Sequence, residues 1–202
     1  VLSISALAQT PCENGMAGAY PCDNVDLMSV RTLGEVGGGD NGNDIWGWTD
    51  SNTGKEYALY GRSHGTSFID ISDPANPIYL GNLPTHTSPN LWRDIKTFGD
   101  YAFIVSEANY HGMQVFDLTQ LADVQDPPVE FEESAYYDGF GKSHNVIINT
   151  ETGFAYGVGT STFSGGLHIV DINDPLNPVL AGSFSEAGYT HDAQSIMYNG
   201  PD

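Results

Sequence analysis

The sequence predicts an all-β protein, a β-propeller built from four-stranded antiparallel blades. One observation is a repeated turn, because "SDPANPIYLGNL" at 72–83 returns about a hundred residues later as "NDPLNPVLAGSF" at 173–184. A second is a polar column, Asp44, Asp94, Asn145 and Asp192, with successive spacings of 50, 51 and 47 residues. Units of four short strands over roughly 45–50 residues are typical of propeller blades. A β-sandwich, the alternative, gives no reason for the same positions to recur at this interval.

The first strand of each unit is expected to carry the polar column. These strands are expected at 43–48, 93–98, 144–149 and 191–196. The second strands follow glycine turns and open with an aromatic residue and an alanine, at 57–58, 101–102 and 154–155. Both patterns indicate strands of about five or six residues joined by Gly, Asp, Asn and Pro turns.

The third strand of each unit is apolar and ends in an aspartate. These strands are expected at 67–72, 113–118 and 167–172, with Asp70, Asp117 and Asp171 capping the turns that follow. The Asp-Pro-x-Asn-Pro turn then leads to the fourth strand, because its prolines fix φ and withhold N–H groups from further pairing. The middle unit lacks this turn and has "TQLADVQDPPVEFEE" instead, and 118–126 is the one segment that favours a helical turn.

The N-terminal segment predicts export. Residues 1–9 are expected to be the remnant of a signal peptide, because an apolar run ends in Ala6-Leu7-Ala8, although a buried strand is the alternative. Export would place the protein outside the cell or on its surface, where Cys12 and Cys22 are expected to pair within the segment 10–30. Without export they would be two free thiols. The blades then occupy 31–202.

The charge balance narrows the class of partner. The chain has 26 acidic residues against 6 Lys and Arg, a formal net charge of −20. Such a charge repels phosphate backbones and anionic lipids, so we expect neither nucleic acid nor membrane surfaces as partners. No run approaches the roughly 18 apolar residues of a membrane helix, so we expect no insertion by this segment.

The repeats resemble those of LVIVD-repeat proteins, and specifically the choice-of-anchor B family. The resemblance lies in "SFIDISDPANP", "MQVFDL" and "LHIVDINDPLNP", together with "PCENGMAGAYPCDNVDL", "YGRSHGTSFIDI" and "SEANYHGMQVFDLTQL". It covers roughly residues 10–202 and implies an exported propeller held at the cell surface by C-terminal anchors that differ among members. It implies no enzyme activity. Only three to four blades fit into this chain, whereas propellers have about four to eight, so we expect a fragment that continues beyond 202.

One face of the propeller is expected to gather polar side chains. In a propeller the first strands line the channel, and the loops between second and third strands lie at the same face as the starts of those strands. Four of the six histidines fall at this face. The candidate ligand-binding residues are Arg62, His64, Trp92, Arg93, Glu107, His111, His144 and His191.

The polar column could bind a metal or join the blades. Asp44, Asp94, Asn145 and Asp192 would present a ring of oxygens suited to Ca²⁺, whereas His144 and His191 would favour a transition metal. Alternatively, the column hydrogen-bonds the backbone of neighbouring blades. A loop-type calcium site at 40–50 is disfavoured because the spacing of its oxygens is irregular and no closing Glu follows.

No catalytic set stands out in the sequence. "GRSHG" at 61–65 matches Gly-x-Ser-x-Gly, but Ser63 would lie between two strands and not on the strand-to-helix turn that motif requires. The function expected first is therefore a non-enzymatic binding or scaffold module that takes a protein or glycan ligand at the polar face. The alternatives are a lactonase-like hydrolase, whose metal activates water, and a purely structural spacer.

Overall fold

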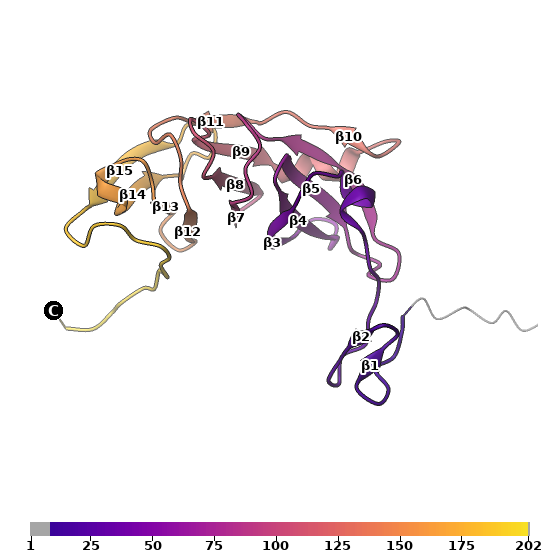
Figure 1. Ribbon diagram of the computed structural model, residues 1–202. Helices are drawn as coiled ribbons and strands as arrows, with labels where there is room; N and C mark the ends of the chain where they lie inside the picture. The colour runs from indigo at the N-terminus through magenta and orange to yellow at the C-terminus, as the bar shows by residue number, and fades with distance from the viewer. Residues whose placement is uncertain (1–8, 202) are drawn as a thin grey trace, which may run out of the picture.

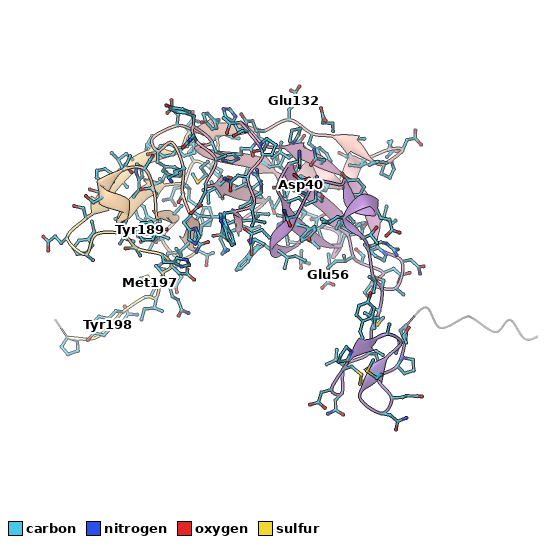
Figure 2. All side chains as sticks on the ribbon, viewed as in Figure 1. Asp40, Glu56, Glu132, Tyr189, Met197 and Tyr198 are labelled. Atoms are coloured by element: carbon cyan, nitrogen blue, oxygen red, sulfur yellow. A yellow bond between two sulfur atoms is a disulfide. The ribbon has the colours of Figure 1, made fainter. Side chains whose placement is uncertain are left out.

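A computed structural model describes residues 9–201, and the predicted all-β propeller-type fold is confirmed. Three sheets stand side by side in an open arc, with β3, β7 and β12 along its concave side (Figure 1). A small hairpin of β1 (Met16–Ala17) and β2 (Tyr20–Pro21) lies apart from the sheets. Within it Cys12 and Cys22 form a disulfide, visible as the yellow bond in Figure 2. The predicted signal remnant lies outside the described residues except for Gln9.

The first sheet has five strands in the order β10-β6-β5-β4-β3. Four of them match the predicted unit: β3 (Gly42–Thr49), β4 (Glu56–Arg62), β5 (Gly65–Asp70) and β6 (Ile78–Pro84). They pair antiparallel in chain order, as hairpins joined by short turns must. A short 3₁₀ helix, η1 (Leu33–Val36), precedes them.

The second sheet has the order β11-β9-β8-β7. Its strands are β7 (Arg93–Phe98), β8 (Tyr101–Ser106), β9 (Met113–Asp117) and β11 (Ala135–Tyr137). The helical turn predicted at 118–126 is a 3₁₀ helix, η2 (Leu118–Asp123). After it, β10 (Val129–Glu130) leaves this sheet and pairs in parallel with β6 of the first, so the first blade has a fifth strand that the sequence did not indicate.

The third sheet has the order β12-β13-β14-β15. Its strands are β12 (Asn145–Asn149), β13 (Phe154–Val158), β14 (Leu167–Asp171) and β15 (Val179–Phe184), with η3 (Phe163–Gly165) before β14. The strand predicted at 191–196 is wrong, since that segment has no regular structure. Side-chain bonds hold it to β12, where Asn149 Nδ2 donates to Ser195 Oγ at 2.9 Å. The chain then runs away from the sheet past Met197 and Tyr198 (Figure 2).

The core lies between the sheets. One cluster joins the first and second sheets, where the ring of Phe68 stacks on Phe116 at 4.4 Å and meets the edge of Phe131 at 5.4 Å. A second cluster joins the second and third sheets and includes Val115 and Val170, both fully buried. Each sheet therefore buries its apolar face against its neighbour, which is how propeller blades are stabilised.

The recurrent aspartates at the ends of the third strands cap turns, as predicted. Asp70 Oδ1 accepts the backbone N–H of Ser72, and Asp171 Oδ1 accepts that of Asn173. Asp117 Oδ1 accepts the N–H of Thr119 at the start of η2. The described residues contain no helix that is both long and apolar enough to span a membrane.

Candidate functional site

The polar column joins neighbouring blades. Asp44 Oδ2 on β3 accepts the backbone N–H of Ile95 on β7 at 2.9 Å. One blade further, Asp94 Oδ2 accepts the N–H of Val146 on β12 at 2.7 Å. Asn145 continues the pattern in another form, because its Nδ2 donates to the carbonyl of His191 at 3.1 Å. These contacts match the blade-joining alternative for the column.

Lys96 brings a positive charge to the two carboxylates. Its Nζ lies 2.6 Å from Asp94 Oδ1 and 3.8 Å from Asp44 Oδ2, and 4.4 Å above the ring of Trp46. Burial, followed by a hydrogen bond and charge repulsion from Asp94, raises the pKa of Asp44 to about 6. The cluster thus holds a carboxyl that takes up a proton in mildly acidic solution.

A cavity of about 350 Å³ opens above the column, and we call it the mouth cavity. It draws its lining from three successive blades and the segment after β15. The lining residues are Asn43, Asp44, Trp92, Arg93, Asp94, His144, Asn145 and His191. The predicted column and four of the predicted ligand-binding residues therefore meet around one hollow, although Asp192 is absent from it.

Aromatic rings form one wall of the mouth cavity. The rings of His144 and His191 lie 4.2 Å apart, and Trp92 lies 6.2 Å from His144. Glu107 reaches the cavity wall indirectly, because its Oε1 holds His144 Nδ1 at 2.7 Å. That contact fixes the orientation of the imidazole and leaves its Nε2 free of any protein partner among the described residues.

A second cavity of about 480 Å³ lies against the other side of the column and shares Asp44, Asp94 and Asn145 with the mouth cavity. Asp192 lines it together with Trp46 and Lys96. Trp46 and Lys96 were not predicted from the sequence, although their spacing from the column aspartates was the available signal. Each follows a column aspartate by two residues on a strand, so its side chain is on the same face.

Arg93, which lines the mouth cavity, forms a buried polar chain with Arg62 and His111. Arg62 donates to the carbonyls of Gly37 and Gly38, and its own carbonyl accepts Nε of Arg93 at 3.0 Å. Arg93 Nη1 donates to His111 Nε2 at 3.0 Å. Burial and then the Arg93 charge lower the pKa of His111 to about 3, so this ring is neutral and accepts the bond.

Arg93 is only partly satisfied. Its Nη2 is buried and has no hydrogen-bond partner within the part of the chain that the structure describes. Burial, and next the like charge of Arg62, lowers the pKa of Arg93 to about 10, so the group remains a cation at neutral pH. No carboxylate described in 9–201 forms an ion pair with either arginine.

His64 and Ser63 lie in the turn between β4 and β5, outside the mouth cavity. Ser63 Oγ lies 3.0 Å from His64 Nδ1 and also accepts the backbone N–H of Asp40 at 3.0 Å. The serine therefore holds the loop that precedes β3. His86, which the sequence interpretation also passed over, stacks on Tyr136 at 3.8 Å beside a separate cavity.

The residues from 9 to 201 contain no group of three or more His, Cys, Asp or Glu side chains placed to hold a metal ion. The three column carboxylates have backbone N–H groups as partners instead. Calcium binding by Asp44, Asp94, Asn145 and Asp192, and transition-metal binding by the histidines, stay predictions that direct titration with each ion would test.

Comparison with known families identifies the repeat. The LVIVD repeat family matches residues 64–85 and 153–186. The chain contains LVIVD repeats. No curated protein and no solved structure matches the chain.

The two LVIVD repeats coincide with the outer part of the blades. They span β5 and β6 of the first sheet and β13 to β15 of the third. Trp92, His144 and His191 all lie outside them. The match therefore concerns the scaffold, and the function of the mouth cavity has to be inferred from its own chemistry.

Proposed function

We propose that this chain is a non-catalytic binding module that takes a saccharide unit of a cell-surface or extracellular glycan in the mouth cavity. The observation that carries the proposal is the convergence of Trp92, His144 and His191 from three separate segments on one hollow. Exposed aromatic side chains next to polar groups are a common composition for ligand sites.

The size of the cavity favours a small ligand group over a protein surface. Its volume of about 350 Å³ is near the lower end of ligand pockets, which run from roughly 300 to 1,000 Å³. A stable protein partner would need about 800 Å² of surface on each side, most of it outside this hollow. One sugar ring with its hydroxyl groups fits the available space better.

The side chains of the cavity complement a sugar. Trp92 is 46% exposed and offers an apolar ring face at the rim. His144 is held by Glu107, so its free Nε2 can exchange a hydrogen bond with a hydroxyl group without a loss of orientation. The proposed site thus combines one stacking surface with a preorganised polar partner.

A glycan array followed by calorimetry tests this function. We expect the wild-type protein to bind a subset of saccharides, and Trp92→Ala or His191→Ala to weaken that binding by about tenfold or more. His86→Ala is the matched control, because it removes an imidazole from a different cavity. If folded wild-type protein binds no saccharide, or if Trp92→Ala binds like wild type, the module is a spacer or binds elsewhere.

We also propose that the protein is exported and is of the choice-of-anchor B type. The LVIVD repeats and the Cys12–Cys22 disulfide support this, because disulfides persist in oxidising compartments. Mass spectrometry of protein isolated from its source tests it. We expect a mature N-terminus that lacks the apolar run 1–8 and an oxidised disulfide, whereas retention of residues 1–8 with free thiols would contradict export.

A further inference from the structure

We propose that the mouth cavity selects acidic saccharides, with the carboxylate of a uronic acid facing Arg93 and the two imidazoles. This inference rests on the proposed saccharide binding and names its substrate class.

Arg93 is a buried cation without a counter-ion. Its side chain is 1% exposed, and its two bonded nitrogens meet a carbonyl oxygen and a neutral imidazole. Among the described residues, the charge that perturbs its pKa is the like charge of Arg62. A buried charge with only neutral partners is costly, and an unsatisfied buried donor calls for a physical reason. A negative ligand group in the adjoining cavity would supply the missing opposite charge.

The acidic side chains around the cavity do not compensate Arg93. Asp94 is paired with Lys96 and accepts the N–H of Val146. Asp44 accepts the N–H of Ile95, and Glu107 is bound to His144. Each carboxylate thus has its own partner in the wall, which leaves the arginine as the charge without one.

The positions of the cationic side chains also favour an anionic ligand. The chain has only six Lys and Arg residues against a net charge of −20. Arg93 and Lys96 line the two cavities beside the column, and Arg62 packs behind Arg93. Half of the permanent cations therefore surround one small region. An acidic protein that binds an anionic group needs such a local concentration of cations, because its overall field repels anions.

Calorimetric titration with sodium D-glucuronate, its methyl ester and D-glucose tests the inference. These probes share a ring and differ in charge. We expect glucuronate to bind at least about tenfold more tightly than the ester or glucose, since charge-assisted hydrogen bonds are roughly twice as strong as neutral ones. Acetate tests binding of a carboxylate that carries no sugar ring. We expect it to bind more weakly than glucuronate because it lacks the ring.

Variants locate the effect. Arg93→Met removes the buried charge and should abolish the preference for glucuronate over the ester. Because this substitution could also unfold the protein, His191→Gln at the exposed rim is the second variant, and we expect it to reduce the same preference. His86→Gln is the control and should leave the preference unchanged.

Each result decides the inference. Equal affinity for glucuronate and its methyl ester would overturn acid selection and leave the proposed saccharide binding standing. Acetate binding as tightly as glucuronate would show a plain anion site and overturn selection of a sugar acid. Absence of binding by all four probes to folded protein would overturn acid selection as stated, whereas saccharide binding in general is decided separately by the glycan array.

Discussion

Asp94 contacts the inner strands on both sides of its own. It accepts the N–H of Val146 from the next blade, pairs with Lys96 and contacts Asp44 of the preceding blade. One carboxylate therefore links three successive inner strands. Nothing in the local sequence distinguishes it from Asp192, which is exposed and bonds only to the adjacent N–H of Ala193.

Substituting Asp94 by alanine should therefore cost much more stability than the same change at Asp192. We expect Asp94→Ala to lower the free energy of unfolding by about 2–4 kcal/mol, because a buried N–H and a half-buried ammonium lose their partner. Asp192→Ala should change it by less than about 0.5 kcal/mol. Urea denaturation of both variants measures the difference, and equal losses would show that the column does not join the blades.

The proton of Asp44 gives a prediction for pH. Its pKa is raised from 3.8 to about 6, so the folded state binds this proton more tightly than the unfolded state does. The contribution of Asp44 to stability is therefore largest below pH 4 and is lost as pH rises through 6. We expect this loss to be about 2 kcal/mol after allowance for solvent screening.

Carbon-13 NMR of the side-chain carboxyl follows this titration directly. In Asp94→Asn the like charge is gone, so the pKa of Asp44 should fall. It should fall only part of the way to 3.8, because burial is the largest cause of the shift and remains. A pKa that does not move in the variant would rule out the contact between the two carboxyls.

At the scale of the element, β10 lies in the connection between η2 and β11 of the second blade, yet it pairs with a strand of the first sheet. The middle unit leaves its own blade after η2, and Val129 pairs with Gly81 on β6. A side chain at Gly81 would collide with the carbonyl of Val129 and with the ring of Phe131. The close approach of β10 therefore requires glycine at this position.

Gly81→Ala should accordingly detach β10 from the first sheet. We expect a loss of about 1–3 kcal/mol in unfolding free energy, together with faster hydrogen exchange at Phe131, whose N–H donates to Asn82 O. Gly47→Ala on β3 is the control, because nothing lies within 4 Å of an added Cβ there. If both variants behave alike, the contact of β10 with β6 does not restrict position 81.

At the scale of the whole molecule, stability comes from the two apolar layers between sheets, and the N-terminal hairpin is separate from them. The hairpin stands off the arc in Figure 1, and its backbone bonds run within 10–27. The link to the first sheet begins at Ser29, whose Oγ donates to the carbonyl of Pro74.

Loss of the disulfide should therefore affect the hairpin alone. We expect Cys12→Ser with Cys22→Ser to shift the unfolding free energy of the sheets by less than about 0.5 kcal/mol, because the closed loop contains none of their residues. The hairpin itself should become sensitive to limited proteolysis. Thermal unfolding measured by circular dichroism tests the first point, and a large drop in melting temperature would show that the hairpin supports the blades.

Most of the fold and part of the site were predictable from sequence. Three full units of strands and the capping roles of Asp70 and Asp171 are confirmed, because strand alternation and turn chemistry are local properties of the chain. The meeting of His144 and His191 also follows from the repeat, since each precedes a column residue by one position and equivalent positions in successive blades face the same axis. Trp92 precedes Asp94 by two positions, so its place in the same wall does not follow from the repeat. The strand at 191–196 failed because a strand needs a pairing partner, and no described strand pairs with it.

The sequence by itself determined where strands and turns occur and which face of each strand is polar, since these depend on near neighbours in the chain. Only the tertiary structure decided the distances between sheets, and with them the partners of each polar group. Asp94 and Arg93 are adjacent in sequence, yet one is fully paired and the other is a cation without a counter-ion. The difference arises because side chains on alternate faces of a strand meet different blades, and the packing of those blades sets what lies within bonding distance.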